Sequence, residues 1–361
     1  MINTARVIAA AAGVLVVLAV GGAPATADPP PGDPLVGVGS EYTLPAMLAL
    51  GTVEPVTCNG MTAPRPTGSA QGRQALRASQ GEDLGSGPGI FNGVNVFGCF
   101  DFARSTTYGG VTPQTVGNYT YVPLGVDAVT LAIHKDGDLP FNWSFAQIQR
   151  VYRCLSTSLT VTPRLGLASG GTWEFWRARM QITEAEIFAG DYPCLAFDHD
   201  SNVGTEALPV WPRVPDNDGT ALAGNLTHVM PFAIPAYLAQ ANSADIATHT
   251  GQVVTDRRGP THLVGVSTPG QPIVQPVVGG VLNINFPAQL RRDVYNVVPT
   301  ADLTEPRIAP MFVGAASTVC AAAVGTVPAR RVTELFGFGY RTTSAGPLEA
   351  SCGSTDLRFN S

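Results

Sequence analysis

Three short loops of glycine and hydroxyl residues each precede a helix-like segment, at positions 37–43, 67–70 and 169–172. The start of a helix leaves backbone N–H groups without intrahelical partners and carries a partial positive charge. Glycine lets an anion approach that backbone closely, and serine and threonine hydroxyls add donors. Three such loops in one chain predict a pocket in which separate helix starts donate hydrogen bonds to one oxyanion. Each hydroxyl residue is also an ordinary N-cap, and this second interpretation stays open.

Residues 1–27 have the pattern of a secretory signal peptide. Arg6 precedes an apolar run over 7–20, and Ala25-Thr26-Ala27 is an A-x-A cleavage pattern. The apolar run is short for a membrane span. We expect cleavage before Asp28, a secreted or extracytoplasmic mature chain, and no membrane insertion after cleavage. No cysteine stands at the cleavage point, so no lipid anchor is evident.

The charge content argues against nucleic acid as a partner. Charged residues make up 13% of the chain, and the formal net charge is −6. Nucleic-acid-binding surfaces depend on clusters of basic residues, which this composition does not supply. An acidic surface gives no general attraction for anions, so an anion site must be local.

The six cysteines predict disulfide bonds, because an even number in an exported chain is typical of a disulfide framework. Six cysteines allow fifteen connectivities. We predict pairing in sequence order, because each bond then joins one local region: 58 with 99, 154 with 194, and 320 with 352. The chain has no C-x-x-C motif, which argues against a metal-binding or redox role for these cysteines.

Neither catalysis nor metal binding has a clear sequence signal. The chain lacks G-x-S-x-G, and its five histidines lack zinc-binding spacing. Residues 198–206 alternate oxygen-bearing side chains as a calcium loop does, but Val203 and Pro209 replace the required glycine and acidic residue, which favours a solvated loop. We expect no cofactor, no metal and no enzymatic activity. A hydrolase remains an alternative, because catalytic triads are recognised by geometry.

The elements that must position these loops alternate between strands and helices. The sequence predicts strands over 35–38, 119–124, 126–133 and 293–298, a strand or loop over 91–102, and extended chain over 253–283. It predicts helices over 46–50, 145–150, 173–188 and 230–241, and one that begins at 307. Such alternation indicates an α/β fold with mostly parallel sheets, in which ligands bind at the carboxyl ends of the strands.

Six segments together resemble the phosphate-binding proteins of bacterial phosphate transporters, within the type 2 periplasmic binding-protein superfamily. In the family's order they are VGVGSEYT (36–43), PRPTGS (64–69), FDFARS (100–105), YVPLGVDAV (121–129), SGGTWEFW (169–176) and DVYNVV (293–298). The resemblance implies an α/β fold of two lobes, each a mixed sheet flanked by helices, joined by two crossover strands around an anion-binding cleft. It places lobe 1 at residues 28–124 plus 293–361 and lobe 2 at residues 125–292.

The resemblance also assigns the ligand contacts by matching motif. They are Ser40, Tyr42, Thr43, Ser69, Arg104, Ser105, Gly170, Gly171 and Thr172. Arg104 is alternatively a surface cation or a partner of Asp101. The chain departs from the family pattern at three points: Gly170 replaces a serine, Thr106 replaces an aspartate, and Arg164 lies further from the loop at 169–172 than the family's arginine.

These observations give two hypotheses of function. In the first, the chain is an exported solute-binding protein that captures a small, phosphate-like inorganic oxyanion in an interlobe cleft, and the resemblance implies an ABC transporter permease as its partner. In the second, it is a secreted, non-catalytic scaffold or interaction protein that kept this fold but lost phosphate binding.

Overall fold

The computed structural model describes residues 33–55, 58–59, 66–156, 160–168, 170–195, 212–325, 329–346 and 348–360. The predicted signal peptide, Ser169 of the loop at 169–172 and the segment 198–209 lie outside these residues. No helix in the described part of the chain is long and apolar enough to cross a bilayer.

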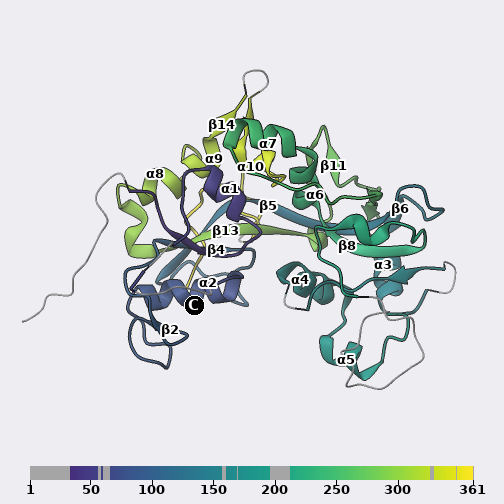
Figure 1. The fold of residues 1–361 in the computed structure, drawn as a ribbon, viewed down its shortest axis with the longest axis horizontal. Helices are drawn as coiled ribbons and strands as arrows, with labels where there is room; N and C mark the ends of the chain where they lie inside the picture. The colour runs from purple at the N-terminus through teal and green to yellow at the C-terminus, as the bar shows by residue number, and fades with distance from the viewer. Residues whose placement is uncertain are drawn as a thin grey trace, which may run out of the picture.

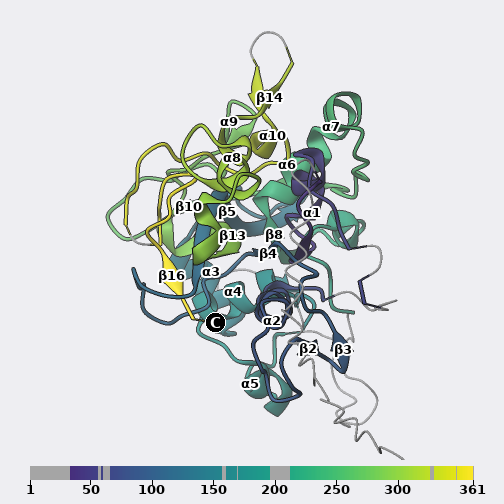
Figure 2. The ribbon, with the colours of Figure 1, turned by 90° about the vertical axis from the view of Figure 1, so that its left-hand side faces the viewer.

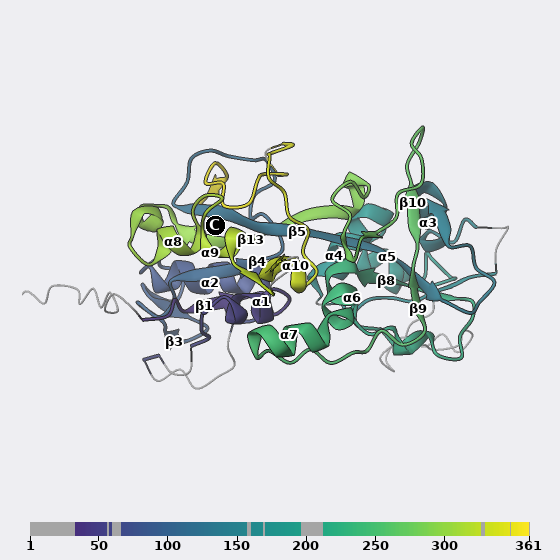
Figure 3. The same cartoon turned by 90° about the horizontal axis from the view of Figure 1, so that it is seen from above.

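Two long antiparallel strands run through the middle of the molecule and connect its two halves (Figures 1 and 3). They are β5 (Tyr119–His134) and β13 (Arg291–Pro299), which pair from Arg291 opposite Ala128 to Pro299 opposite Tyr119. Every residue of β5 is buried, as its nearly continuous apolar sequence requires. These two strands therefore form the frame on which both halves are built.

The main sheet is mixed, with the order β1-β4-β13-β5-β8-β7, and β9 and β16 also pair with β5. The further strands are β1 (Gly37–Gly39), β4 (Phe102–Ser105), β7 (Thr162–Pro163), β8 (His228–Ala233), β9 (Thr261–Leu263) and β16 (Arg358–Phe359). The α/β fold with a mixed sheet is confirmed. The expectation of mostly parallel pairing is wrong, because β13, β8, β9 and β16 all run antiparallel to β5.

Helices cover both faces of this sheet. In Figure 1, α2 and α4 lie below its left and right parts, and Figure 2 shows α8, α9 and α10 on the face opposite α2. The helices are α1 (Leu44–Ala49), α2 (Ser69–Ser79), α3 (Phe145–Tyr152), α4 (Gly171–Met180), α5 (Glu184–Ala189), α6 (Ile234–Ala241), α7 (Ser243–Thr250), α8 (Ile308–Phe312), α9 (Thr318–Ala321) and α10 (Val332–Leu335).

Short strands and 3₁₀ turns fill the connections. Paired strands are β2 (Ile90–Phe91) with β3 (Val94–Asn95), β6 (Asn142–Ser144) with β10 (Gly265–Ser267), β11 (Val277–Val278) with β12 (Val281–Leu282), and β14 (Ala323–Val324) with β15 (Arg330–Arg331). The 3₁₀ turns are η1 (Gly219–Leu222), η2 (Ala288–Leu290) and η3 (Thr300–Thr304).

The hydrophobic core is divided along the two long strands. One cluster runs from Val126 to Leu290 and includes Trp143, Trp173 and Trp176. Two further clusters, around Phe312 and Tyr295, are built mainly from the chain before this region and the chain after it, and the first of them also includes Ile246. The predicted lobe boundaries fall inside β5 and β13, and the lobes themselves stay a prediction.

Several predicted elements need correction. Residues 119–133 form one strand, not two runs broken at Gly125. Residues 230–233 belong to β8, so the predicted helix over 230–241 begins only at residue 234. The helix over 173–188 is interrupted at Gln181, which has a left-handed φ of 58°, and the chain after 307 forms two short helices instead of one.

The predicted cysteine pairing is confirmed. The bonds are Cys58–Cys99, Cys154–Cys194 and Cys320–Cys352. Disulfides persist in oxidising compartments, which agrees with an extracytoplasmic location.

Candidate functional site

Two helix starts meet at Thr106, the residue that follows β4. The Ser69 hydroxyl at the start of α2 lies 3.1 Å from the Thr106 hydroxyl and accepts a hydrogen bond of 2.9 Å from the Thr106 N–H. At the start of α4, a Cβ atom placed on Gly171 would lie 3.4 Å from the Thr106 hydroxyl. Gly68 and Gly170 occupy the N-cap positions, and no described side chain caps either helix. Both helix starts therefore lie beside one threonine, and their first N–H groups have no partners within the helix.

The position of α2 depends on contact between two glycines. A Cβ atom on Gly72, within α2, would lie only 2.4 Å from the Gly39 Cα of β1. Gly39 has a φ of +107°, which favours glycine, and its N–H donates to the Pro66 carbonyl before α2. This close backbone packing fixes where Ser69 begins the helix.

A buried ion pair connects the long strands to α4. Asp127 on β5 is fully buried and lies opposite Arg292 of β13 in the strand register. The Arg292 Nε donates to the Asp127 Oδ2 at 2.8 Å. Its other guanidinium nitrogens donate to the Gly171 carbonyl at 3.0 Å and the Thr172 hydroxyl at 3.2 Å. One side chain thus joins β5, β13 and the first turn of α4.

A second carboxylate and a tyrosine complete this cluster. The Tyr42 hydroxyl donates to the Asp127 Oδ1 at 3.2 Å, and burial, reinforced by the charges of Asp127 and Asp216, raises the tyrosine pKa well above its usual value. Burial also raises the pKa of Asp216, whose carboxylate accepts a hydrogen bond from Thr172. Tyr42 therefore remains a hydrogen-bond donor, and two carboxylates share the charge of Arg292.

The predicted contacts of segment 100–105 lie in the framework of the site. Arg104 is buried, and its guanidinium donates to the carbonyls of Ser40 (3.0 Å) and Gly39 (3.4 Å) and lies 3.6 Å from the Glu54 carboxylate. The Ser105 hydroxyl donates to the Thr107 carbonyl at 2.6 Å and accepts a bond from the Arg73 guanidinium at 2.9 Å. Both side chains hold neighbouring loops in place.

Three ligand contacts were predicted from the first loop. Ser40 and Thr43 belong to local structure around α1, whereas Tyr42 belongs to the buried cluster. The Ser40 hydroxyl accepts a hydrogen bond from the Tyr42 N–H at 3.3 Å, and Thr43 is buried at the N-cap of α1 without a side-chain capping bond. Tyr42 belongs to the buried cluster through its bond to Asp127. Ser69, Gly171 and Thr172 contact Thr106 or Arg292, and Gly170 caps α4 next to them.

Sequence reasoning missed Arg73, Asp127, Asp216 and Arg292. Arg73 follows Ser69 by four residues, so the helical period alone places both on one face of α2. Asp127 and Arg292 carry charges within or beside strands that are otherwise apolar, which is a signal for a buried pair. Asp216 lies in a polar turn and has no comparable signal.

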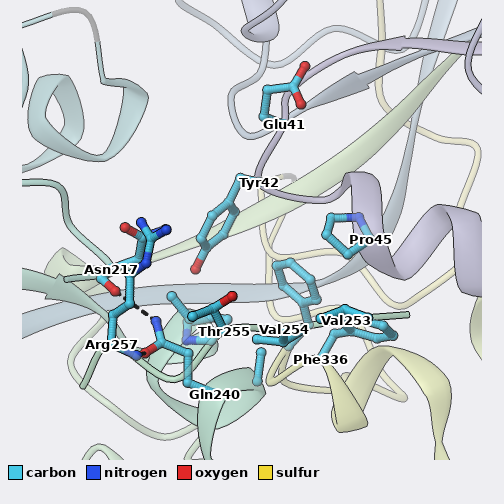
Figure 4. A pocket seen from close by; sticks show the side chains of 14 residues that line it. Glu41, Tyr42, Pro45, Asn217, Gln240, Val253, Val254, Thr255, Arg257 and Phe336 are labelled. Carbon is cyan, nitrogen blue, oxygen red and sulfur yellow. Dashed lines mark hydrogen bonds between the residues drawn. The ribbon is translucent and has the colours of Figure 1, made fainter. Parts of the chain in front are cut away.

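A pocket of about 290 Å³ adjoins this cluster on the side of Tyr42 (Figure 4). Its wall includes Glu41 and Pro45 from the first loop and α1, Gln240 from α6, and Arg257 from the segment after α7. Across the described residues, no group of three or more histidine, cysteine or acidic side chains is arranged to hold a metal ion.

Comparison with solved structures finds proteins of phosphate transport. An ABC-type phosphate transport receptor from Vibrio cholerae is 13% identical, with a TM-score of 0.43, over 77% of this chain and 91% of that one. A putative phosphate ABC transporter substrate-binding protein with bound phosphate from Clostridium perfringens is 14% identical, with a TM-score of 0.39, over 77% and 90%. No protein-family model and no curated protein matches the chain. The chain is thus similar in its path to phosphate-binding proteins of ABC transporters.

Proposed function

We propose that this protein is an exported, two-lobed solute-binding protein that captures a small, phosphate-like oxyanion between the starts of α2 and α4. The observation that supports it is the meeting of Ser69 and Gly171 at Thr106, with glycine N-caps on both helices. The lobes are residues 28–124 plus 293–361 and residues 125–292. The protein binds its ligand without chemical change and delivers it to an ABC transporter permease.

The donors suit an oxyanion. The first N–H groups of both helices and the hydroxyls of Ser69 and Thr106 provide neutral hydrogen bonds, and the helix dipoles add positive potential. The Arg292 guanidinium against the first turn of α4 offsets part of the anion's charge. The ligand links the two halves, and bending of β5 and β13 opens and closes the cleft.

The carboxylates favour a protonated oxyanion. Asp127 and Asp216 repel a fully ionised ligand, whereas an ion that still carries a proton donates it to a carboxylate. We therefore expect phosphate to bind more tightly than sulfate near neutral pH.

Isothermal titration calorimetry of the mature chain with phosphate, arsenate and sulfate tests this proposal. We expect Ser69→Ala and Thr106→Val each to weaken phosphate binding about tenfold, since each removes a hydrogen bond to a charged ligand. Ser86→Ala, in an exposed loop, is the matched control and should bind as the unaltered chain does. No binding of any of these anions at millimolar concentration would reject the proposal.

One observation favours the alternative of a scaffold that lost its ligand. The groups around the cleft already satisfy each other, because Arg292 donates to Asp127, Gly171 and Thr172, and Ser69 pairs with Thr106. The scaffold hypothesis expects no oxyanion binding and normal phosphate uptake after deletion of the gene. Impaired uptake would exclude it.

A further inference from the structure

We infer that the pocket beside Tyr42 binds a small organic carboxylate with an apolar body. This site goes beyond the proposed function, because its lining residues and its ligand class both differ from those of the oxyanion cleft. The pocket lies between the first loop with α1 on one side and α6 with residues 253–257 on the other. Figure 4 shows Asn217, Gln240 and Arg257 together at one side and Pro45, Val253 and Phe336 at the other, with Tyr42 between them.

Gln240 builds the polar side of the pocket. Its side chain is buried, with an exposed fraction of 5%. Its Nε2 donates to the Asn217 carbonyl at 2.7 Å, and its Oε1 accepts the Arg257 N–H at 2.7 Å. The Arg257 carbonyl in turn accepts a hydrogen bond from the Gly219 N–H at 2.8 Å. One buried amide therefore fixes the backbone at both Asn217 and Arg257.

Gln240 bonds only to the backbone of Asn217 and Arg257, and the side chains of these two exposed residues are available to a ligand. Neither the Asn217 carboxamide nor the Arg257 guanidinium has a hydrogen bond or ion pair to another residue of the described chain. The adjacent Arg258 differs, because it pairs with Asp256 at 2.7 Å and lies over the Tyr237 ring at 5.3 Å. A guanidinium beside a carboxamide offers several N–H donors to one carboxylate.

The other side of the pocket is apolar and suits a compact hydrocarbon or aromatic group. Its wall includes Pro45, Pro235, Ala239, Val254, Phe336 and Phe338. The Tyr42 ring packs edge-on against Phe338 with centroids 5.6 Å apart, and its hydroxyl is already bonded to Asp127. At about 290 Å³ the pocket lies at the lower end of the volumes of ligand pockets, about 300 Å³, which suits a small molecule such as benzoate.

The charge distribution selects one carboxylate. Arg257 lies at the polar side, the apolar wall lies opposite it, and Figure 4 shows Glu41 above Tyr42, apart from both sides. A dicarboxylate would bring its second charge against this apolar wall, where the charge has no partner. A single carboxylate at Arg257 with an apolar group toward Phe336 meets complementary groups at both ends.

The contacts Tyr42–Asp127–Arg292–Thr172 separate this pocket from the starts of α2 and α4. A ligand in the pocket contacts Arg257 and Asn217, whereas an oxyanion in the cleft contacts Ser69 and Thr106. Substitutions can therefore distinguish the two sites.

Calorimetric titration of the full mature chain with benzoate, phenylacetate, benzamide and benzylamine tests the inference. We expect benzoate or phenylacetate to bind and the neutral amide and the amine to bind at least tenfold more weakly. Arg257→Ala should weaken carboxylate binding about tenfold or more, and Asn217→Asp should do the same by placing a negative charge beside Arg257. Arg258→Ala is the matched control, and Ser69→Ala should leave carboxylate binding unchanged.

The inference fails if neither carboxylate binds at millimolar concentration, if Arg257→Ala binds as the unaltered chain does, or if Arg258→Ala causes the same loss. It also fails if benzylamine binds as tightly as benzoate, which would identify Glu41 as the determinant. Each of these results leaves the phosphate titration unaffected, so the two proposals stand or fall separately.

Discussion

Arg292 on β13 donates from its Nε to the Oδ2 of Asp127 on β5 at 2.8 Å, and both side chains are withdrawn from solvent. The pair lies where the two long strands pass between the halves of the molecule. Removing two charges from water is costly, so such a pair adds little net stability compared with an apolar one. Loss of one partner is far more costly, because the other charge then stays buried alone.

Asp127→Asn should lower the free energy of unfolding by about 3 kcal/mol, because it takes from the buried Arg292 guanidinium the carboxylate to which it is directly bonded. Urea denaturation measures this change. The control is Asp256→Asn in the exposed Asp256–Arg258 pair, which should cost no more than about 1 kcal/mol. Equal losses in both variants would mean that solvent reaches Arg292.

The sequence predicted local features better than distant ones. Each disulfide joins cysteines at most 41 residues apart, and pairing neighbours in sequence order was sufficient. Gly125 misled the strand prediction because glycine normally weakens a strand. Here a Cβ atom at Gly125 would lie 3.0 Å from the Phe338 Cβ. The glycine therefore allows close packing of a segment more than 200 residues away in sequence.

In the candidate site, too, local features were predicted and contacts between distant residues were not. Ser69 and Thr172 were predicted from local helix-start patterns, which need no tertiary information. The Asp127–Arg292 pair depends on strand register between positions 165 residues apart, and a single sequence does not specify that register. Arg104 was predicted as a ligand contact because it adjoins Ser105, but side chains alternate along a strand, and its guanidinium reaches the carbonyls of the first loop.

Gly72→Ala should destabilise the protein by about 2 kcal/mol, because the new methyl group would overlap the Gly39 Cα and push α2 away from β1. It should also weaken phosphate binding, because α2 carries Ser69. Thermal denaturation and calorimetry measure the two effects. Gln74→Ala, on the exposed side of α2, should change neither, and unchanged stability in Gly72→Ala would contradict the glycine contact.

Asp293 should make stability depend on pH in the weakly acidic range. Burial raises its pKa to about 6, although Arg341 lies within hydrogen-bond distance of its carboxylate. The pKa of Asp293 is higher in the folded protein than in the unfolded chain, where it is near 4. Protonated Asp293 therefore contributes fully to folding stability below pH 4, and this contribution is lost as pH rises through 6. The loss is at most about 3 kcal/mol, from a shift of about two pKa units.

Asp293→Asn cannot ionise, so its stability relative to the unaltered chain should improve between pH 4 and pH 7. Urea denaturation at several pH values measures this difference. Asp245→Asn, at an exposed position on α7, is the control, and its free energy of unfolding should change with pH as that of the unaltered chain does. A constant difference between Asp293→Asn and the unaltered chain over this range would contradict the prediction.

His228 should produce the opposite pH dependence. It is buried, and burial together with the nearby charge of Arg164 lowers its pKa to about 4. The Arg164 guanidinium lies 3.3 Å from the imidazole Nδ1. The folded protein holds this imidazole neutral, whereas the unfolded chain binds a proton near pH 6.5, so stability is lost as pH falls from 6.5 toward 4.

His228→Gln should therefore lose less stability than the unaltered chain over that range, as measured by urea denaturation. His249→Gln, at an exposed position on α7, should retain the full loss, and an identical loss in both variants would show that His228 is protonated in the folded protein.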